Sequence, residues 1–167
     1  MRYLQADDIA FNHRDGYSLS REAPPELDTL LDGISAYRQS GGRGVIGLCP
    51  SSVVSVKSRK EGGNYESVLE SLVDEFSGRG FLVVLFPNAT RATSGDAERN
   101  NDLPLIRRVL RAVTISEGAP MPLACDADVN ASSIKRIIAA TDVVIVSRFH
   151  AMVGALSLEV PSVVLGW

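Results

Sequence analysis

Residues 143–167, VVIVSRFHAMVGALSLEVPSVVLGW, decide the fold expected of this chain, because they read as a strand, a helix and a second strand in direct succession. The opening run of β-branched residues is typical of a strand that is buried on both faces of a sheet. That strand delivers Arg148 and His150 directly into the beginning of an apolar helix. Charged side chains at the end of a buried strand need a partner, so this junction is the first candidate for a functional site.

The same alternation of apolar runs and helical patterns extends upstream to residue 44. Strands are predicted at 44–52, 81–89, 121–128, 142–148 and 161–167. Helices are predicted at 64–80, 100–116, 130–141 and 149–159. Continuous apolar strands that alternate with helices indicate a parallel sheet covered on both faces. The predicted fold is therefore α/β, a doubly wound, mostly parallel Rossmann-like sheet of about five strands.

The first 43 residues differ from the rest of the chain. They begin with a polar, irregular stretch that contains a Pro-Pro pair, and residues 27–44 then read as one amphipathic helix that ends in glycines. We interpret residues 1–43 as a linker with a leading helix, or as the remnant of a preceding domain. Residues 44–167 are the predicted Rossmann-like domain.

Composition excludes several classes of partner. The chain has 167 residues, 45% of them hydrophobic, and a formal net charge of −3, so it can build a core but offers no basic surface for nucleic acid.

No apolar run is long enough to span a membrane, and the N-terminus lacks the shape of a signal peptide. Cys49 and Cys125 read as buried thiols, and no metal-ligand spacing is visible. The sequence predicts a cytoplasmic protein without a metal or cofactor.

Parallel sheets bind their ligands beyond the carboxyl ends of the strands, so the residues at those ends are the candidates for binding. Ser51 and Ser52 follow the first strand and begin a segment, 50–67, that carries three basic residues and a Gly-Gly pair. This segment is either a phosphate or carboxylate cradle or a solvated, flexible basic loop. It lacks the glycine spacing of a dinucleotide site and of a P-loop.

The second strand is followed by a long polar loop, residues 87–102, that begins with Asn88 as a candidate binding residue. Long loops in compact sheet proteins are often functional. Asp102 at the end of this loop precedes a Leu-Pro pair, and this order favours a helix cap over a catalytic acid.

The fourth strand ends in Ser147, Arg148 and the first turn of the next helix, which contains His150. An arginine fork at this position suits a carboxylate or a phosphate. The helix dipole disfavours the cationic form of a histidine in the first turn, so His150 can exchange a proton near neutral pH. The alternative is structural: Arg148 would pair with Asp126 or Asp128, and the histidine would bond a neighbouring carbonyl.

At this point the sequence resembles the polysaccharide pyruvyl transferase family. The resemblance covers roughly residues 44–167 and is strongest at S-R-x-H-A (147–151) and in the strand entry LEVPSVVLGW, where Glu159 replaces the glycine usual in the family. Members of this family transfer the enolpyruvyl unit of phosphoenolpyruvate to two hydroxyls of a sugar, which forms a cyclic ketal and releases phosphate. They resemble two-domain glycosyltransferases of the B type.

The resemblance implies that this chain is the C-terminal, donor-binding half of such an enzyme in cell-surface polysaccharide biosynthesis. It implies that Arg148 binds the phosphate or carboxylate of the donor and that His150 is the general acid, with Ser147, Ser51, Ser52 and Asn88 as further binding residues. The partners implied are phosphoenolpyruvate, as a substrate rather than a cofactor, and a sugar or glycan acceptor. The acceptor half and the helices expected after residue 167 are missing, so we expect a truncated chain.

Two other readings stay open at this stage. The chain could be the donor-binding half of a nucleotide-sugar glycosyltransferase, in which Arg148 contacts a diphosphate. It could also be a catalytically inactive module that binds a partner or assembles with further copies of itself. Apolar surface left by the missing helices would favour such a homo-oligomer.

Overall fold

The computed structural model describes residues 24–90 and 100–165. Along these residues the elements follow in this order: α1 (Pro25–Gln39), β1 (Val45–Cys49), α2 (Ser52–Lys60), α3 (Tyr65–Gly78), β2 (Leu82–Leu85), α4 (Leu103–Ala112), β3 (Leu123–Ala124), α5 (Ala131–Ala139), β4 (Val143–Val146), α6 (Phe149–Ser157) and β5 (Ser162–Val164). The predicted α/β fold is confirmed.

The strands form one five-stranded sheet in the order β3-β2-β1-β4-β5, and every neighbouring pair is parallel. β1 is the central strand, with Gly47 in register with Val84 on one side and Val144 on the other. The chain first adds strands on one side of β1 and then crosses back to add β4 and β5 on the other. The direction of winding therefore reverses between β1 and β4, and such a switch point is where open α/β sheets bind ligands.

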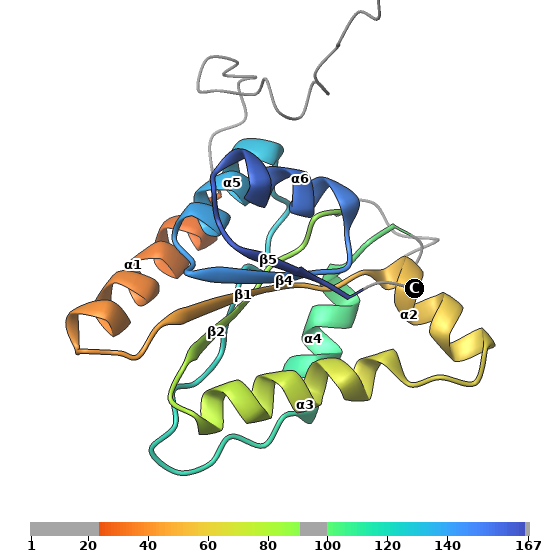
Figure 1. The fold of residues 1–167 in the computed structure, drawn as a ribbon, viewed down its shortest axis with the longest axis horizontal. Coiled ribbons are helices and arrows are strands. Elements are labelled where there is room, and N and C mark those ends of the chain that lie inside the picture. Colours follow the sequence, from red (N-terminus) through yellow and green to blue (C-terminus); the bar gives the residue numbers. More distant parts are fainter. Residues whose placement is uncertain (1–23, 91–99, 166–167) are drawn as a thin grey trace, which may run out of the picture.

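Helices cover both faces of the sheet (Figure 1). α1, α5 and α6 lie on one face, and α3 and α4 lie on the other. The side chains of β1 alternate between these two layers: Val45 and Cys49 pack with the first group, whereas Ile46 and Leu48 pack with the second. This two-sided burial is the reason why β1 is a continuous apolar run rather than an alternating one.

The leading helix belongs to the core of the sheet. α1 begins at Pro25, as expected of a proline in a first helical turn, and it buries Leu27, Leu30 and Ile34 against α5 and the sheet. The predicted amphipathic helix is thus confirmed, and it shares its hydrophobic layer with the later elements. The division of the chain at residue 44 stays a prediction, and residues 1–23 lie outside the described residues.

The prediction of a loop over residues 50–67 is wrong, because Ser52–Lys60 form α2. The Ser51 hydroxyl caps this helix by accepting a hydrogen bond from the Val54 amide. Val54 is buried on one side, while the three basic residues gather in the last turn, where they interact favourably with the helix dipole. The basic side chains therefore lie toward the far end of α2, away from the residues that directly follow β1.

Candidate functional site

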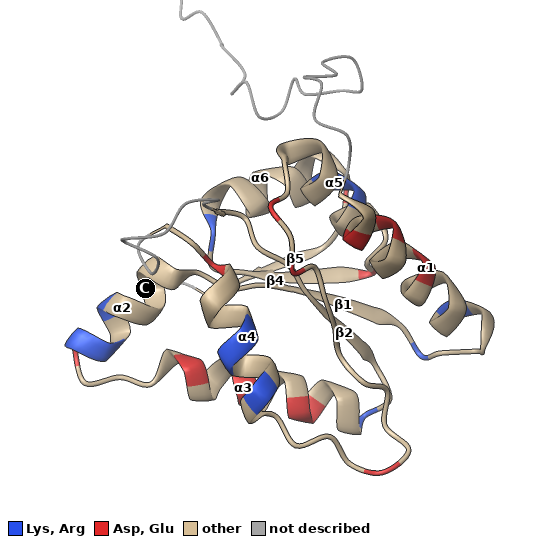
Figure 2. Ribbon diagram, turned by 180° about the vertical axis from the view of Figure 1, so that it is seen from behind, with Lys and Arg blue, Asp and Glu red and all other residues tan. Residues whose placement is uncertain are grey.

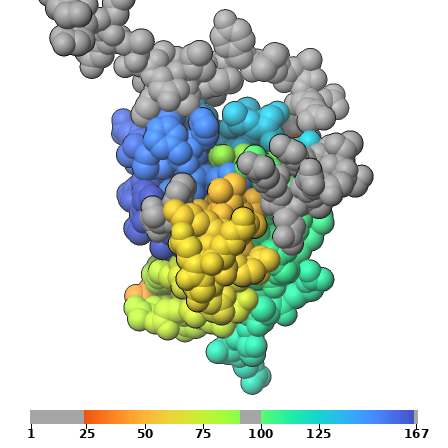
Figure 3. Space-filling model, turned by 90° about the vertical axis from the view of Figure 1, so that its right-hand side faces the viewer, coloured from red at the N-terminus to blue at the C-terminus, as the bar shows by residue number. Residues whose placement is uncertain are grey.

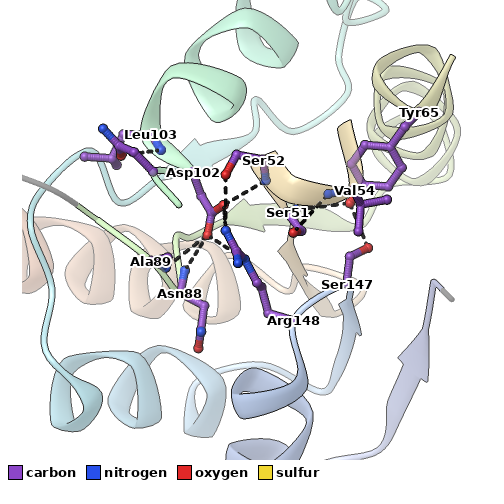
Figure 4. A network of polar contacts seen from close by, with 11 residues as sticks. Ser51, Ser52, Val54, Tyr65, Asn88, Ala89, Asp102, Leu103, Ser147 and Arg148 are labelled. Carbon is purple, nitrogen blue, oxygen red and sulfur yellow. Dashed lines mark hydrogen bonds and ion pairs between the residues drawn. The ribbon is translucent and has the colours of Figure 1, made fainter. Parts of the chain in front are cut away.

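The polar residues predicted at the strand ends gather at the switch point between β1 and β4. Ser51 and Ser52 follow β1, whereas Ser147 and Arg148 follow the neighbouring strand β4, and the two segments face one another (Figure 4). In the space-filling view of this end of the sheet, α2 lies in the middle, beside the atoms of α6 and β5 (Figure 3). The parallel sheet thus brings together residues that lie almost a hundred positions apart in the sequence.

The centre of this site is Asp102, whose side chain is fully buried. Its Oδ1 accepts a hydrogen bond from the Ser52 amide at 2.8 Å, and its Oδ2 accepts bonds from the amides of Asn88 (3.3 Å) and Ala89 (3.0 Å). Arg148 donates to both oxygens, from Nη2 to Oδ1 at 2.6 Å and from Nε to Oδ2 at 3.2 Å. One carboxylate therefore joins the segments that follow β1, β2 and β4.

Two sequence interpretations are corrected here. Asp102 occupies the residue before α4, but its carboxylate makes no capping bond, and the Asn101 side chain accepts the bond from the Leu103 amide instead. The partner of Arg148 is Asp102 rather than Asp126 or Asp128. Asp126 forms its own ion pair with Arg107, as expected of a carboxylate within easy reach of a basic helix.

The serines hold the site together through their backbone and hydroxyl groups. The Ser52 hydroxyl accepts a further hydrogen bond from Arg148 Nη2 at 3.2 Å, and both Ser51 and Ser52 are buried. The hydroxyl of Ser51 is used as the cap of α2. These two residues, predicted as donor-binding groups, therefore support Arg148 and the helix that follows β1.

Tyr65 at the beginning of α3 is a member of the site that the sequence prediction missed. Its hydroxyl accepts a hydrogen bond from the Ser51 amide at 3.2 Å and donates one to the Ser147 hydroxyl at 2.7 Å. Burial raises the pKa of this phenol to about 12, so it stays protonated and acts as a fixed donor. In the sequence Tyr65 reads only as an apolar position of a helix, which conceals its polar role.

His150 lies in the first turn of α6 as predicted, and its side chain is exposed to solvent. Its ring packs edge-to-face against the ring of Phe149, with the centroids 5.8 Å apart. The residue before α6 is Arg148, whose side chain makes no capping bond, so the first amides of this helix have no side-chain acceptor from it. An exposed imidazole in the first turn of a helix can meet an incoming anion and exchange a proton with it.

Asn88 lies next to the carboxylate through its backbone but turns its side chain away from it (Figure 4). The half-buried side-chain amide makes no hydrogen bond with the other described residues. Within residues 24–90 and 100–165, its hydrogen-bonding groups are therefore free for a ligand at the end of β2. The rest of the predicted loop, residues 91–99, lies outside the described residues.

Cys49, the last residue of β1, lies close enough to Asp102 and Arg148 for their charges to act on its thiol. Burial raises the pKa of its thiol well above the ordinary value, and the nearby Asp102 carboxylate adds to the increase. A thiol in this state is a poor nucleophile, because the thiolate is the reactive form. The Cys49 thiol is thus not suited to act as a nucleophile at this site.

A second polar cluster holds α2 to α3 and α4. Glu66 of α3 accepts hydrogen bonds from Ser55 at 2.7 Å, from Arg59 at 3.0 Å and from Arg108 at 2.9 and 3.1 Å. Figure 2 shows acidic residues on α3 and basic residues on α4, and Arg108 of α4 forms an ion pair with Glu66 of α3. These residues line an open hollow of about 610 Å³ beside Glu70. Hydrogen bonding to Arg108, supported by the other donors, lowers the pKa of Glu66 to about 2 against the opposing effect of burial.

The doubly wound sheet, with its polar cluster at the carboxyl ends of β1 and β4, defines a Rossmann-like fold. The chain belongs to the polysaccharide pyruvyl transferase family, because the model of that family matches residues 60–167, well over half of the sequence. Ser147, Arg148 and His150 lie within the match, whereas Ser51 and Ser52 precede it. No curated protein and no solved structure gave a match. In the described ranges, none of the helices combines the length and apolar character that crossing a membrane requires.

Proposed function

We propose that this chain binds phosphoenolpyruvate at the switch point between β1 and β4 and supports transfer of its pyruvyl group to two hydroxyls of a sugar. The observation that carries the proposal is the presence of Arg148, the residue before α6, and His150, in the first turn of α6, at one strand-to-helix junction in a member of this family. Ketal formation in cell-surface polysaccharide synthesis is the reaction that the family membership favours. The donor is a substrate, and the proposal includes no further cofactor.

Arg148 contacts the phosphate or the carboxylate of the donor. Phosphoenolpyruvate is a compact anion, and the planar guanidinium matches such groups through paired N–H donors. The first amides of α6 add further donors, because helix N-termini attract anions. The Ser147 hydroxyl and the open Asn88 side chain, both next to this position, supply neutral polar contacts.

His150 acts as the general acid. Protonation of the methylene carbon leaves an oxocarbenium-like centre at the adjacent carbon, and the first sugar hydroxyl attacks it and loses a proton. Departure of phosphate regenerates that centre, and the second hydroxyl then closes the ketal. The exposed position of His150 in the first turn of α6 allows it to reach the donor and to recover a proton from solvent.

The acceptor is a sugar or glycan, and its binding requires surface beyond the residues assigned to the donor. Self-association of the chain and a cytoplasmic location stay predictions. The rival function within the same fold is that of a nucleotide-sugar glycosyltransferase, whose donor carries a diphosphate instead of a phosphate ester.

Calorimetric titration of the 167-residue chain with phosphoenolpyruvate, and separately with UDP-glucose, tests this proposal. The expected result is binding of phosphoenolpyruvate that is lost in Arg148→Ala and retained in Arg107→Ala, a matched variant whose arginine also pairs with an aspartate but is exposed. Binding of UDP-glucose alone would assign the site to nucleotide-sugar transfer. Binding of neither ligand would contradict a donor site in this chain.

A further inference from the structure

The buried carboxylate of Asp102 has a task that its place before a helix does not explain. We propose that Asp102 is a positioning residue that fixes the guanidinium of Arg148 and directs its remaining N–H groups toward the donor. The inference rests on the proposed function for the identity of the donor, but the geometry of the pair is independent of it.

The arrangement is side-on, because Arg148 uses Nε and Nη2 to bind the two carboxylate oxygens. The Ser52 hydroxyl accepts another bond from Nη2. An arginine has five N–H groups in one plane, and these three bonds occupy the groups on Nε and Nη2. Within the described residues the two N–H groups of Nη1 have no recorded acceptor. Because the fork is planar and rigid, fixing one edge fixes the direction of Nη1 as well.

Asp102 is itself held from three sides. The amides of Ser52, Asn88 and Ala89 point at its oxygens, and its own amide donates to the Ala89 carbonyl at 2.8 Å. A carboxylate that accepts this many bonds cannot rotate without breaking several of them. The orientation of Arg148 is therefore set by the backbone at the ends of β1 and β2, before any ligand arrives.

Charge gives the pair a second property. Asp102 has no exposed surface, and the Arg148 side chain is 15% exposed, so each charge depends on the other for compensation. Arg148 consequently approaches a donor as part of a neutral pair, and its contribution is directional hydrogen bonding rather than net charge. A lysine could pair with Asp102 but could not present two further N–H groups at a fixed angle.

A purely structural staple is the alternative role for Asp102. If Asp102 only stabilises the fold, removing its carboxylate should lower stability while the folded molecules bind donor as before. A positioning residue predicts a loss of affinity in molecules that are still folded, together with a change in the environment of the Arg148 side chain. These expectations differ in what is measured on the folded protein.

The test uses the full 167-residue chain and two readouts. The first is the Nε–H signal of Arg148 in nitrogen-15 NMR spectra, identified by its absence in Arg148→Lys. The second is the affinity for phosphoenolpyruvate, measured by calorimetry on samples whose folding is checked by circular dichroism. The variants are Asp102→Asn and Ser52→Ala, with Asp126→Asn as the matched control, because Asp126 holds Arg107 by a similar two-oxygen contact on the surface.

In the wild-type chain we expect a sharp, slowly exchanging Nε–H signal. Asp102→Asn should broaden this signal and weaken donor binding at least about tenfold, since misplaced positioning groups forfeit much of their effect. Ser52→Ala should weaken binding by about threefold, and Asp126→Asn should leave both readouts unchanged. Wild-type affinity and an unshifted signal in folded Asp102→Asn would overturn the inference.

Two further outcomes separate this inference from the proposed function. If the wild-type chain binds no phosphoenolpyruvate while its Arg148 signal still depends on Asp102, the proposed donor is refuted and the positioning of Arg148 is supported. If Asp102→Asn does not fold, Ser52→Ala decides the matter, because unchanged affinity in that variant would overturn the inference.

Discussion

The Glu66 carboxylate joins α3 to α2 and α4, and we expect removal of its charge to destabilise the chain. The substitution Glu66→Gln keeps the size of the side chain but removes the charge that Arg59 and Arg108 share. The pKa of Glu66 lies at about 2 in the folded chain against an ordinary value of 4.5. Each pKa unit corresponds to about 1.4 kcal/mol, so the ionised carboxylate contributes on the order of 3 kcal/mol to stability at neutral pH.

The pH dependence follows from the direction of this change. A carboxyl whose pKa is lowered by folding stabilises the native state above its unfolded pKa, and that contribution disappears as the pH falls through the folded pKa. The difference in stability between wild type and Glu66→Gln should therefore be constant from pH 6 to 8. It should shrink to about 2 kcal/mol near pH 3.5 and vanish toward pH 2.

Urea unfolding followed by circular dichroism at several pH values measures this difference. The matched control is Glu70→Gln, one turn further along α3 at the same hollow, for which the described residues provide no ion pair. We expect the control to change stability by less than about 0.5 kcal/mol at any pH. A difference between wild type and Glu66→Gln that is below about 1 kcal/mol at pH 7, or that grows as the pH falls, would refute the reasoning.

Three further substitutions, the first with a matched control, test the packing of the domain by urea unfolding. Gly47→Ala should destabilise the chain by about 1–3 kcal/mol, because a Cβ at Gly47 would lie 2.8 Å from a Val144 methyl carbon. The matched control Gly78→Ala has open space around the added Cβ and should be neutral or stabilising. Tyr65→Phe should cost about 1–2 kcal/mol, because the buried Ser51 amide and the half-buried Ser147 hydroxyl lose their partner; a neutral effect would contradict this network. Ser77→Ala should stabilise by about 1 kcal/mol, because the Ser77 hydroxyl is buried without a hydrogen bond in the described structure; a destabilised variant would show that this hydroxyl has a partner.

The sequence predicted the strands of the sheet interior well because their signal is local. β1, β2 and β4 are buried on both faces, and each appears in the sequence as an uninterrupted apolar run. The edge strands were harder to delimit. β3 pairs over only two residues, although the sequence predicted a strand over 121–128, because a strand at the edge of a sheet has one neighbour to define its length.

The missed helix α2 has a different cause. Its serines and basic residues resemble a loop in composition, and its buried face consists of short side chains such as Ser55, so hydrophobic periodicity gives little signal. The cap provided by Ser51 and the docking of Val54 become visible only in the tertiary structure. Tertiary packing thus overrides the local preference of this segment.

The sequence placed Ser52 and Arg148 at strand ends, and the structure brings these two residues together, but the sequence did not identify the carboxylate that joins them. The position of Arg148 at a strand end follows from local pattern, and parallel strands bring such ends together by geometry. Its partner Asp102 lies 46 residues away and had a plausible local role before a helix. Sequence reasoning assigns a local role first, and only the three-dimensional arrangement of the loops after β1, β2 and β4 shows that the carboxylate turns toward the arginine.

The order of the strands also governs when this site can come into existence. Cys49 of β1 is in register with Val146 of β4, 97 positions later, whereas β2 pairs with β1 and β3 pairs with β2 over shorter separations. Closing the longest loop carries the largest entropic penalty, so we expect β1, β2 and β3 to associate before β4 docks. During synthesis, β1 would then have an unpaired edge until β4 is made. Asp102 would likewise have no counter-charge until Arg148 is made. The site therefore forms only when β4 docks against β1.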